Sequence, residues 1–326
     1  MTSQAEPRVL IVGAQKGGTT SLAAALASDS RFSLPKGETP LFEDPIYATR
    51  GEATLERIRK SIPLGRIGAI KRPDWLGRPE AAARMVRHCP DALVLCALRE
   101  RVQRTVSAYY WYLQTRLIPF APLNEGLSRI LDSKESGIQP PSPRALEIVD
   151  YSLYGLGVTR LLEAGFDRKK ILVGHARPDG PVQFNLLDRL QRSLELEEPI
   201  EHIRGRRRNP GVYDYRRVRV LRARSRFLDH GRHGSVHQTS KVVPLLNVAS
   251  KSFTAIERSL FSNVGANAPA ELHPELRQRL DVHFKDDDRR LRETIGHELG
   301  VVLGNREGRT TEERYCTTQL RTKERP

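Results

Sequence analysis

Cysteine is scarce in this chain of 326 residues, where Cys89, Cys96 and Cys316 are odd in number and widely spaced. Three such cysteines form neither a disulfide framework nor a metal-binding pattern, which favours a reducing compartment. No apolar run approaches the roughly 20 residues of a membrane-spanning helix, and residues 1–8 lack the apolar segment of a secretory signal. We therefore expect a cytoplasmic protein with no transmembrane segment.

Acidic residues are in the minority: 54 Lys and Arg accompany 39 Asp and Glu, a formal net charge of +15. A positive excess of this size could attract three kinds of partner: nucleic acid, an anionic surface that the protein contacts peripherally, or an anionic cofactor or substrate. The excess is densest in Arg204–Arg232, where eleven arginines accompany Asp214 and Asp229. No recognisable nucleic-acid-binding module surrounds this segment, so we expect a solvated arginine-rich helix and not a nucleic-acid partner.

The composition, 38% hydrophobic and 29% charged, is typical of a soluble globular protein of sufficient length for a sizeable core. We predict a single domain over residues 1–304, followed by a polar tail at 305–326. Residues 119–150 contain a proline cluster and are predicted to be an insertion with little regular structure in its second half. Long insertions of this kind commonly serve as lids or acceptor-binding loops.

Short apolar runs alternate with helical patterns along the chain. The runs lack strict polar alternation, as strands buried on both faces do, and they lie at 9–12, 92–98, 170–174 and, more weakly, 67–70. Apolar residues recur at helical spacing in 101–116, 152–165 and 276–295. This order predicts an α/β fold with a central parallel sheet flanked by helices.

The first apolar run ends in a glycine-rich loop, and an alanine-rich helical segment follows it. Gly13 and Gly18 have the glycine spacing of a Walker A loop, but Thr19 stands where that motif needs lysine, and the lysine is Lys16. Glycines and a helix start build a cradle for a phosphate-like anion. We therefore predict an anion site without Mg-ATP chemistry, made by Lys16, Gly17, Gly18, Thr19, Thr20 and Ser21.

Three further segments carry candidate chemistry. Glu38, ahead of the apolar pair Leu41 and Phe42, would serve as a general base if it were partly desolvated beside a phosphate-type group. Lys71 follows the weak strand, at the end of a sheet where ligands bind. Arg99 ends a buried strand and Ser107 follows about two helical turns later, so the pair could bind a second phosphate. Taken alone, Glu38 is better explained as a surface glutamate, and Lys71 is equally consistent with a solvated basic turn.

Together, in this order, the four elements resemble the P-loop-related sulfotransferases that use 3′-phosphoadenosine 5′-phosphosulfate (PAPS). The resemblance is closest to the branch of heparan sulfate-type carbohydrate sulfotransferases and their bacterial relatives. Lys16–Thr20 matches the family's K-x-G-T-T/S loop, and Lys36–Phe42 resembles K-E-x-x-F-F with a glycine inserted. Lys71–Trp75 resembles K-S-P-x-Y, and Arg99–Tyr109 resembles R-D/N-P-x-x-R-x-x-S-x-Y with Arg101 in place of proline.

The resemblance implies a P-loop-NTPase-like sulfotransferase fold and a PAPS-dependent enzyme. It would move a sulfonate from PAPS to the hydroxyl of a carbohydrate, glycolipid or natural product, leaving adenosine 3′,5′-bisphosphate and requiring no metal. Glu38 would be the general base, and Lys16 and Lys71 would neutralise charge on the transferring group. Cofactor binding would fall to Lys16, Gly17, Gly18, Thr19, Thr20, Ser21, Arg99 and Ser107.

Several points stay open from the sequence. The loop that completes the 3′-phosphate site has two candidates, Gly205–Arg208 and His230–Gly234. Arg104 either holds the anion loop or faces solvent. Aromatic residues Trp75 and Tyr110–Tyr112 would stack on a sugar if exposed, although helix packing is the simpler interpretation for the tyrosines. A P-loop small-molecule kinase and a non-catalytic nucleic-acid-binding protein are the alternative functions.

Overall fold

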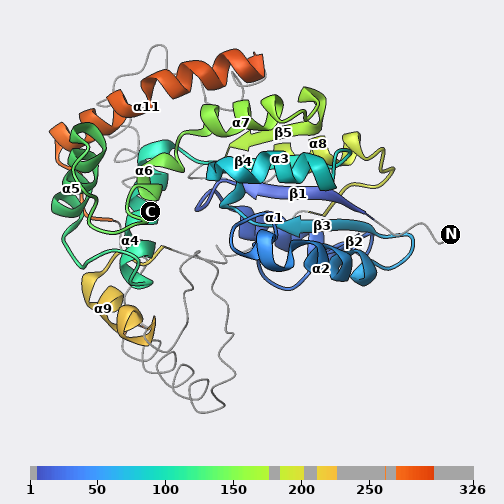
Figure 1. Ribbon diagram of the computed structural model, residues 1–326, viewed down its shortest axis with the longest axis horizontal. Helices are drawn as coiled ribbons and strands as arrows, with labels where there is room; N and C mark the ends of the chain where they lie inside the picture. Colours follow the sequence, from blue (N-terminus) through green and yellow to red (C-terminus); the bar gives the residue numbers. More distant parts are fainter. Residues whose placement is uncertain (1–5, 176–183, 202–210, 226–260, 262–268, 297–326) are drawn as a thin grey trace, which may run out of the picture.

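The structure is a computed structural model, and it describes residues 6–175, 184–201, 211–225, 261 and 269–296. Within this part of the chain, five strands form one fully parallel sheet in the order β2-β3-β1-β4-β5 (Figure 1). The strands are β1 (Pro7–Gly13), β2 (Phe32–Ser33), β3 (Ile67–Lys71), β4 (Leu93–Leu98) and β5 (Ile171–His175). The four predicted strands are confirmed, and the two-residue β2 is too short to leave a sequence pattern.

The strands are buried on both faces, as their continuous apolar runs predict. In β1, Leu10 and Val12 belong to the hydrophobic cluster on one face of the sheet. Val9 and Ile11 belong to the cluster on the opposite face, and all four side chains are fully buried. Helices must therefore cover both sides of the sheet.

The helices lie where this requires. Apolar side chains of α1 (Thr19–Ser28) and α8 (Phe184–Ser193) cover one face, and those of α2 (Ile46–Ser61), α3 (Pro79–His88) and α7 (Tyr154–Glu163) cover the other. Short 3₁₀ turns, η1 (Trp75–Gly77) and η2 (Arg168–Lys170), follow β3 and precede β5. The sandwich confirms the predicted α/β fold.

A second, purely helical cluster lies to one side of the sheet (Figure 1). It contains α4 (Arg101–Gln114), α5 (Leu123–Ser136), α6 (Glu147–Asp150), α9 (Tyr215–Arg224) and the first half of α11 (Pro274–Ile295). The far end of α11 packs on α7 and joins the cluster above the sheet. One long helix therefore ties the two bodies together.

The segment 119–150 packs into this helical cluster and does not form an extended loop on the surface. Leu127 and Ile130 of α5 and Ile148 of α6 are fully buried. Residues 137–146, which contain the proline cluster, have no regular structure, in agreement with the sequence prediction. A role as lid or acceptor loop stays a prediction.

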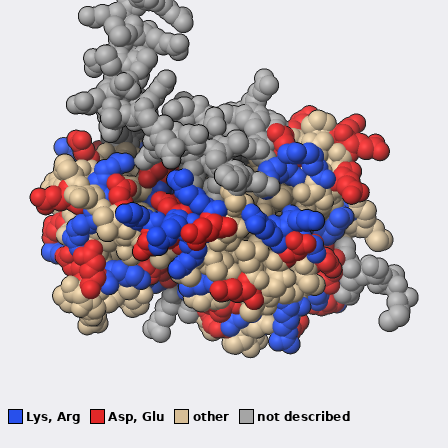
Figure 2. All heavy atoms as spheres, turned by 90° about the horizontal axis from the view of Figure 1, so that it is seen from above, with Lys and Arg blue, Asp and Glu red and all other residues tan. Residues whose placement is uncertain are grey.

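The described part of the arginine-rich segment packs on the protein. Asp214 caps α9, accepting a hydrogen bond from the backbone N–H of Arg217, and Val218 is fully buried. Arg222 Nη1 donates to the carbonyls of Leu113 (2.8 Å) and Ile118 (2.9 Å). On the face shown in Figure 2, basic and acidic side chains are interspersed, without a continuous basic patch. None of the helices described here is both long and apolar enough to cross a membrane.

Candidate active site

The glycine-rich loop leaves the carboxyl end of the central strand β1 and enters α1 directly. Lys16 (φ 67°) and Gly18 (φ 97°) both have left-handed backbone conformations, which are typical of loops that bind anions through backbone N–H groups. Gly18 is the cap residue of α1, and the first turn of that helix carries no acidic side chain. The unpaired N–H groups at the helix start are therefore placed for an external anion.

The loop is held tightly against β4. The backbone N–H of Ala14 donates to the carbonyl oxygen of Ala97 at 2.7 Å. A Cβ atom built on Gly17 would lie 2.1 Å from the same carbonyl oxygen, far inside van der Waals contact. Glycine is therefore required at position 17 for close approach of two backbones and not for an unusual dihedral angle.

Arg104 holds the loop from the side of α4. Its guanidinium is completely buried, with Nε donating to the backbone carbonyl of Gln15 (3.1 Å) and Nη2 to the side-chain oxygen of Gln15 (3.0 Å). Gln15 Nε2 in turn donates to Asp74 Oδ1 at 3.1 Å. The sequence left open whether Arg104 holds the anion loop or faces solvent, and in the structure it holds the loop.

Lys16 is half-buried and surrounded by charge. Burial, followed by the neighbouring Arg99 and Arg104, lowers the pKa of Lys16 to about 8, and Glu38 acts in the opposite direction. The anion loop follows β1, Lys71 ends β3 and Arg99 follows β4, and these three strands are adjacent and parallel, so the three segments lie at the same edge of the sheet.

Glu38 lies between the two cations that follow β3. Its Oε1 is 3.3 Å from Lys71 Nζ, and its Oε2 accepts a hydrogen bond from Arg72 Nη1 at 3.0 Å. The backbone N–H of Thr39 donates to the Lys71 carbonyl oxygen (3.0 Å), which fastens the Glu38 loop to the strand end. The Glu38 side chain keeps 38% of its exposure, so the carboxylate remains accessible to a ligand.

The apolar pair after Glu38 anchors the segment as expected. Leu41 and Phe42 are buried, and the Phe42 ring packs on Trp75 with centroids 4.8 Å apart. Glu38 was expected to be partly desolvated, but its side chain is exposed and pairs with two cations. Lys71 and Arg72 therefore orient the carboxylate, and an apolar pocket does not.

Sequence reasoning missed Arg72, whose guanidinium pairs with three carboxylates. Arg72 is 1% exposed and donates from Nε and Nη2 to the two oxygens of the buried Glu43, at 2.5 and 2.8 Å. Its Nη2 also lies 3.1 Å from Asp74 Oδ2. We call Arg72, Glu38, Glu43 and Asp74 the Arg72 cluster. A basic residue beside Lys71 resembles a solvated turn in sequence, because two of its three acidic partners, Glu38 and Glu43, lie 34 and 29 residues earlier in the chain.

Arg99 and Ser107 have fewer contacts that relate them to the other predicted site residues. Arg99 follows β4, is half-buried, and its carbonyl accepts a hydrogen bond from Tyr154 Oη at 2.9 Å. Ser107 is buried in α4, and no hydrogen bond within the described ranges joins it to the other predicted site residues. Of the loop hydroxyls, Thr19 is buried whereas Thr20 and Ser21 are partly exposed. Both candidates for the second 3′-phosphate loop lie outside the described residues.

The aromatic candidates are structural. Trp75, Tyr110 and Tyr112 are each at most 1% exposed, so none of them is placed to stack on a sugar, and Trp111 is half-buried. Helix packing is therefore confirmed for the tyrosines. Among the residues that the structure describes, no group of three or more His, Cys, Asp or Glu side chains is arranged to hold a metal.

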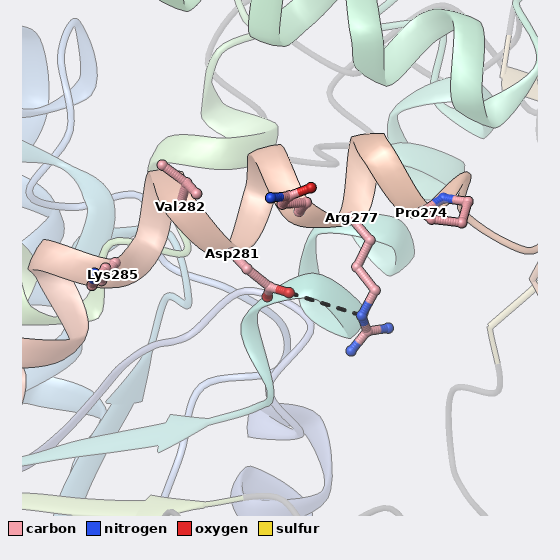
Figure 3. Close-up of a pocket in the computed structure, with 6 residues that line it drawn as sticks. Pro274, Arg277, Asp281, Val282 and Lys285 are labelled. Atoms are coloured by element: carbon pink, nitrogen blue, oxygen red, sulfur yellow. Dashed lines mark ion pairs between the residues drawn. The ribbon is translucent and has the colours of Figure 1, made fainter. Parts of the chain in front are cut away.

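A hollow of about 420 Å³ lies on the outer side of α11 (Figure 3). No predicted site residue lines it; the lining residues are Pro274, Arg277, Gln278, Asp281, Val282 and Lys285. It is therefore separate from the loop and the Arg72 cluster.

Comparison with known proteins finds similarity among solved structures. No family model and no curated protein matches the sequence. Among solved structures, the chain is similar to the crystal structure of a sulfotransferase from Alicyclobacillus acidocaldarius, with a TM-score of 0.52 and 19% identity over 89% of this chain and 96% of that one. At this identity the likeness establishes the fold alone. The chain thus has the P-loop-like α/β fold seen in a sulfotransferase, as the motifs predicted.

Proposed function

We propose that this protein is a sulfotransferase that moves a sulfonate from PAPS to an acceptor hydroxyl. The observation that supports the proposal is that a phosphate-type loop, Lys71 and Arg99 lie at the carboxyl ends of the adjacent parallel strands β1, β3 and β4, with Glu38 paired to Lys71. The loop has its lysine at position 16, and Arg99 stands at the end of β4. The similarity in fold to a known sulfotransferase supports the same assignment.

The residues fit such a cofactor. The loop at Lys16–Ser21 would hold the 5′-phosphosulfate through backbone N–H groups, hydroxyls and one ammonium. Arg99 and Ser107 would bind the 3′-phosphate, for which a guanidinium is suited because of its paired donors. When bound, PAPS supplies the sulfonate, which leaves adenosine 3′,5′-bisphosphate behind. We propose that this step requires no metal, since Lys16 and Lys71 supply the positive charge.

Glu38 would act as general base toward the acceptor. As the acceptor oxygen forms its bond to sulfur, the hydroxyl proton passes to the Glu38 carboxylate and the bond between sulfur and the 5′-phosphate oxygen breaks. Lys16 and Lys71 would neutralise the negative charge that develops on the transferring group and the departing phosphate. Lys71 pairs directly with Glu38 at 3.3 Å, and the charge of Glu38 raises the pKa of Lys16 against the effect of burial.

The proposal also covers the acceptor, the domain organisation and the cellular location. The proposed acceptor is a carbohydrate, a glycolipid or a hydroxylated natural product. The protein is proposed to be a single domain that acts in the cytoplasm. A kinase of the P-loop class is disfavoured because Thr19, and not lysine, follows Gly18, and because Arg99 occupies the strand end where an acidic magnesium ligand is needed.

Titration calorimetry tests the proposal against its two alternatives. Adenosine 3′,5′-bisphosphate is expected to bind without metal, at least ten times more tightly than adenosine 5′-monophosphate, because Arg99 and Ser107 read the 3′-phosphate. ATP with magnesium and a random oligonucleotide serve as comparison ligands. Preferential binding of ATP with magnesium would favour the kinase, and preferential binding of the oligonucleotide would favour the nucleic-acid-binding protein.

The lowered pKa of Lys16 predicts a pH dependence of that binding. Lys16 is charged well below pH 8 and loses its proton above it, since its pKa is about 8. A phosphate group, fully ionised above pH 7, prefers the charged lysine. The dissociation constant of adenosine 3′,5′-bisphosphate should therefore rise by up to about tenfold per pH unit between roughly pH 8 and 10.

Lys16→Met is the control for this titration. It should bind the nucleotide more weakly at pH 7 and show a nearly flat dissociation constant over the same range. A flat profile for the unmodified protein would place Lys16 away from the bound phosphate.

A further inference from the structure

The two cations that contact Glu38 differ in how firmly they are held. Lys71 ends β3, its side chain is 11% exposed, and its ion pair with Glu38 spans 3.3 Å. Arg72 is one residue further on, is 1% exposed, and uses three nitrogens on three carboxylates. A lysine on a flexible stem can turn to another anion, whereas a buried guanidinium with fixed donors cannot.

The clamp on Arg72 is made by two buried carboxylates. Glu43 is 1% exposed and accepts two hydrogen bonds from Arg72, and the Asp74 side chain is 3% exposed. The backbone N–H of Arg72 also donates to the Ile11 carbonyl on β1 at 2.9 Å. Removing the guanidinium would leave the buried Glu43 carboxylate without its hydrogen-bond donor, so the position of Arg72 is strongly determined.

A chain of buried hydrogen bonds connects this clamp to the anion loop. Asp74, which lies beside Arg72, accepts from Gln15, and Gln15 accepts from Arg104. Gln15 belongs to the loop itself and is 7% exposed. The residues that fix the loop and the residue that fixes Glu38 are thus parts of one polar network.

We infer that Arg72 is the positioning residue of Glu38 and keeps the carboxylate aimed at the acceptor while Lys71 is engaged elsewhere. The inference rests on the proposed sulfotransferase function. In the ligand-free protein Lys71 and Arg72 share Glu38; once Lys71 turns to the transferring sulfonate, Arg72 Nη1 alone holds Glu38 Oε2. Arg72 acts on the reaction through Glu38 and has no contact with the reacting atoms.

Two variants test this inference. Arg72→Lys keeps the charge but loses the fork of donors, so kcat should fall by roughly 10- to 100-fold with KM for PAPS changed by less than about threefold. Arg72→Met with Glu43→Gln removes the buried pair together, which protects the fold. In this double variant kcat should fall similarly.

Arg101→Lys is the matched control. Arg101 is also buried and pairs with two carboxylates, Asp287 and Asp288, both at 2.7 Å, but it joins α4 to α11. Arg101→Lys should lower the melting temperature without changing kcat or KM for PAPS.

If both Arg72 variants only lower the melting temperature, with kcat unchanged, the positioning role is wrong. If the unmodified protein neither turns over PAPS nor binds adenosine 3′,5′-bisphosphate, the proposed function fails instead. The two failures are therefore distinguishable in the same set of measurements.

Discussion

Glu38→Gln should lower kcat for sulfonate transfer by about 10²- to 10⁴-fold, the usual contribution of a general base. The amide keeps the size of the side chain and accepts a hydrogen bond from Arg72 Nη1, as the carboxylate does at 3.0 Å. It cannot take up the acceptor proton. The dissociation constant of adenosine 3′,5′-bisphosphate should change by less than about threefold, because Glu38 is repelled by phosphate and contributes no donor to it.

The measurement is turnover with PAPS and a responsive acceptor, beside titration calorimetry with the bisphosphate. Glu56→Gln is a closely matched control. The Glu56 side chain is also 38% exposed and its carboxylate also lies 3.3 Å from a lysine, Lys60, but on the surface of α2. Glu56→Gln should retain full turnover. Undiminished kcat in Glu38→Gln would mean that another group removes the acceptor proton.

The features that the sequence predicted correctly are those encoded locally. β1 and β4 are continuous apolar runs, and such runs have few alternatives to a strand buried on both faces. Gly165, predicted to end α7, has the left-handed φ of 109° that a helix end favours. The anion loop is likewise local, since its glycines, its lysine and the following helix are neighbours along the chain.

The features that the sequence missed depend on partners far along the chain. Arg72 finds its carboxylates 29 and 34 residues earlier, at Glu43 and Glu38. Arg104 reaches back 89 residues to Gln15. A single arginine in sequence has the same pattern whether it is solvated or clamped, because the outcome depends on which carboxylates the fold brings near. The candidate base was visible in sequence, but the group that orients it was not.

The polar network also changes how the site should be regarded. Lys16, Lys71 and Arg99 are the accessible cations, whereas Arg72 and Arg104 are fully buried. The accessible ones are available to a ligand, and the buried ones hold the loop and Glu38 in place. Preorganised donors of this kind cost no rearrangement at the moment of reaction. The separation of binding cations from structural cations is therefore a property of burial, which residue type alone does not reveal.

Gly17→Ala should abolish cofactor binding, with the dissociation constant of adenosine 3′,5′-bisphosphate raised by more than about 100-fold. The new methyl group would lie 2.1 Å from the Ala97 carbonyl oxygen and 2.9 Å from that of Ala14. Neither oxygen can yield easily. Ala97 belongs to β4, which is paired on both sides in the sheet, and its carbonyl also accepts the 2.7 Å hydrogen bond from Ala14. The loop must therefore lift away from the strand, which misdirects its N–H groups.

The same lift should destabilise the fold by about 1–3 kcal/mol, the usual cost of overpacking, measured by urea unfolding. Gly65→Ala provides the control. Gly65 has a left-handed φ of 78° with nothing within 4 Å of its added Cβ, so alanine there strains only the backbone. It should cost about 1 kcal/mol and leave nucleotide binding unchanged. If Gly17→Ala bound the bisphosphate as the unmodified protein does, the anion would have to lie elsewhere than on this loop, and the sulfotransferase assignment would lose its main support.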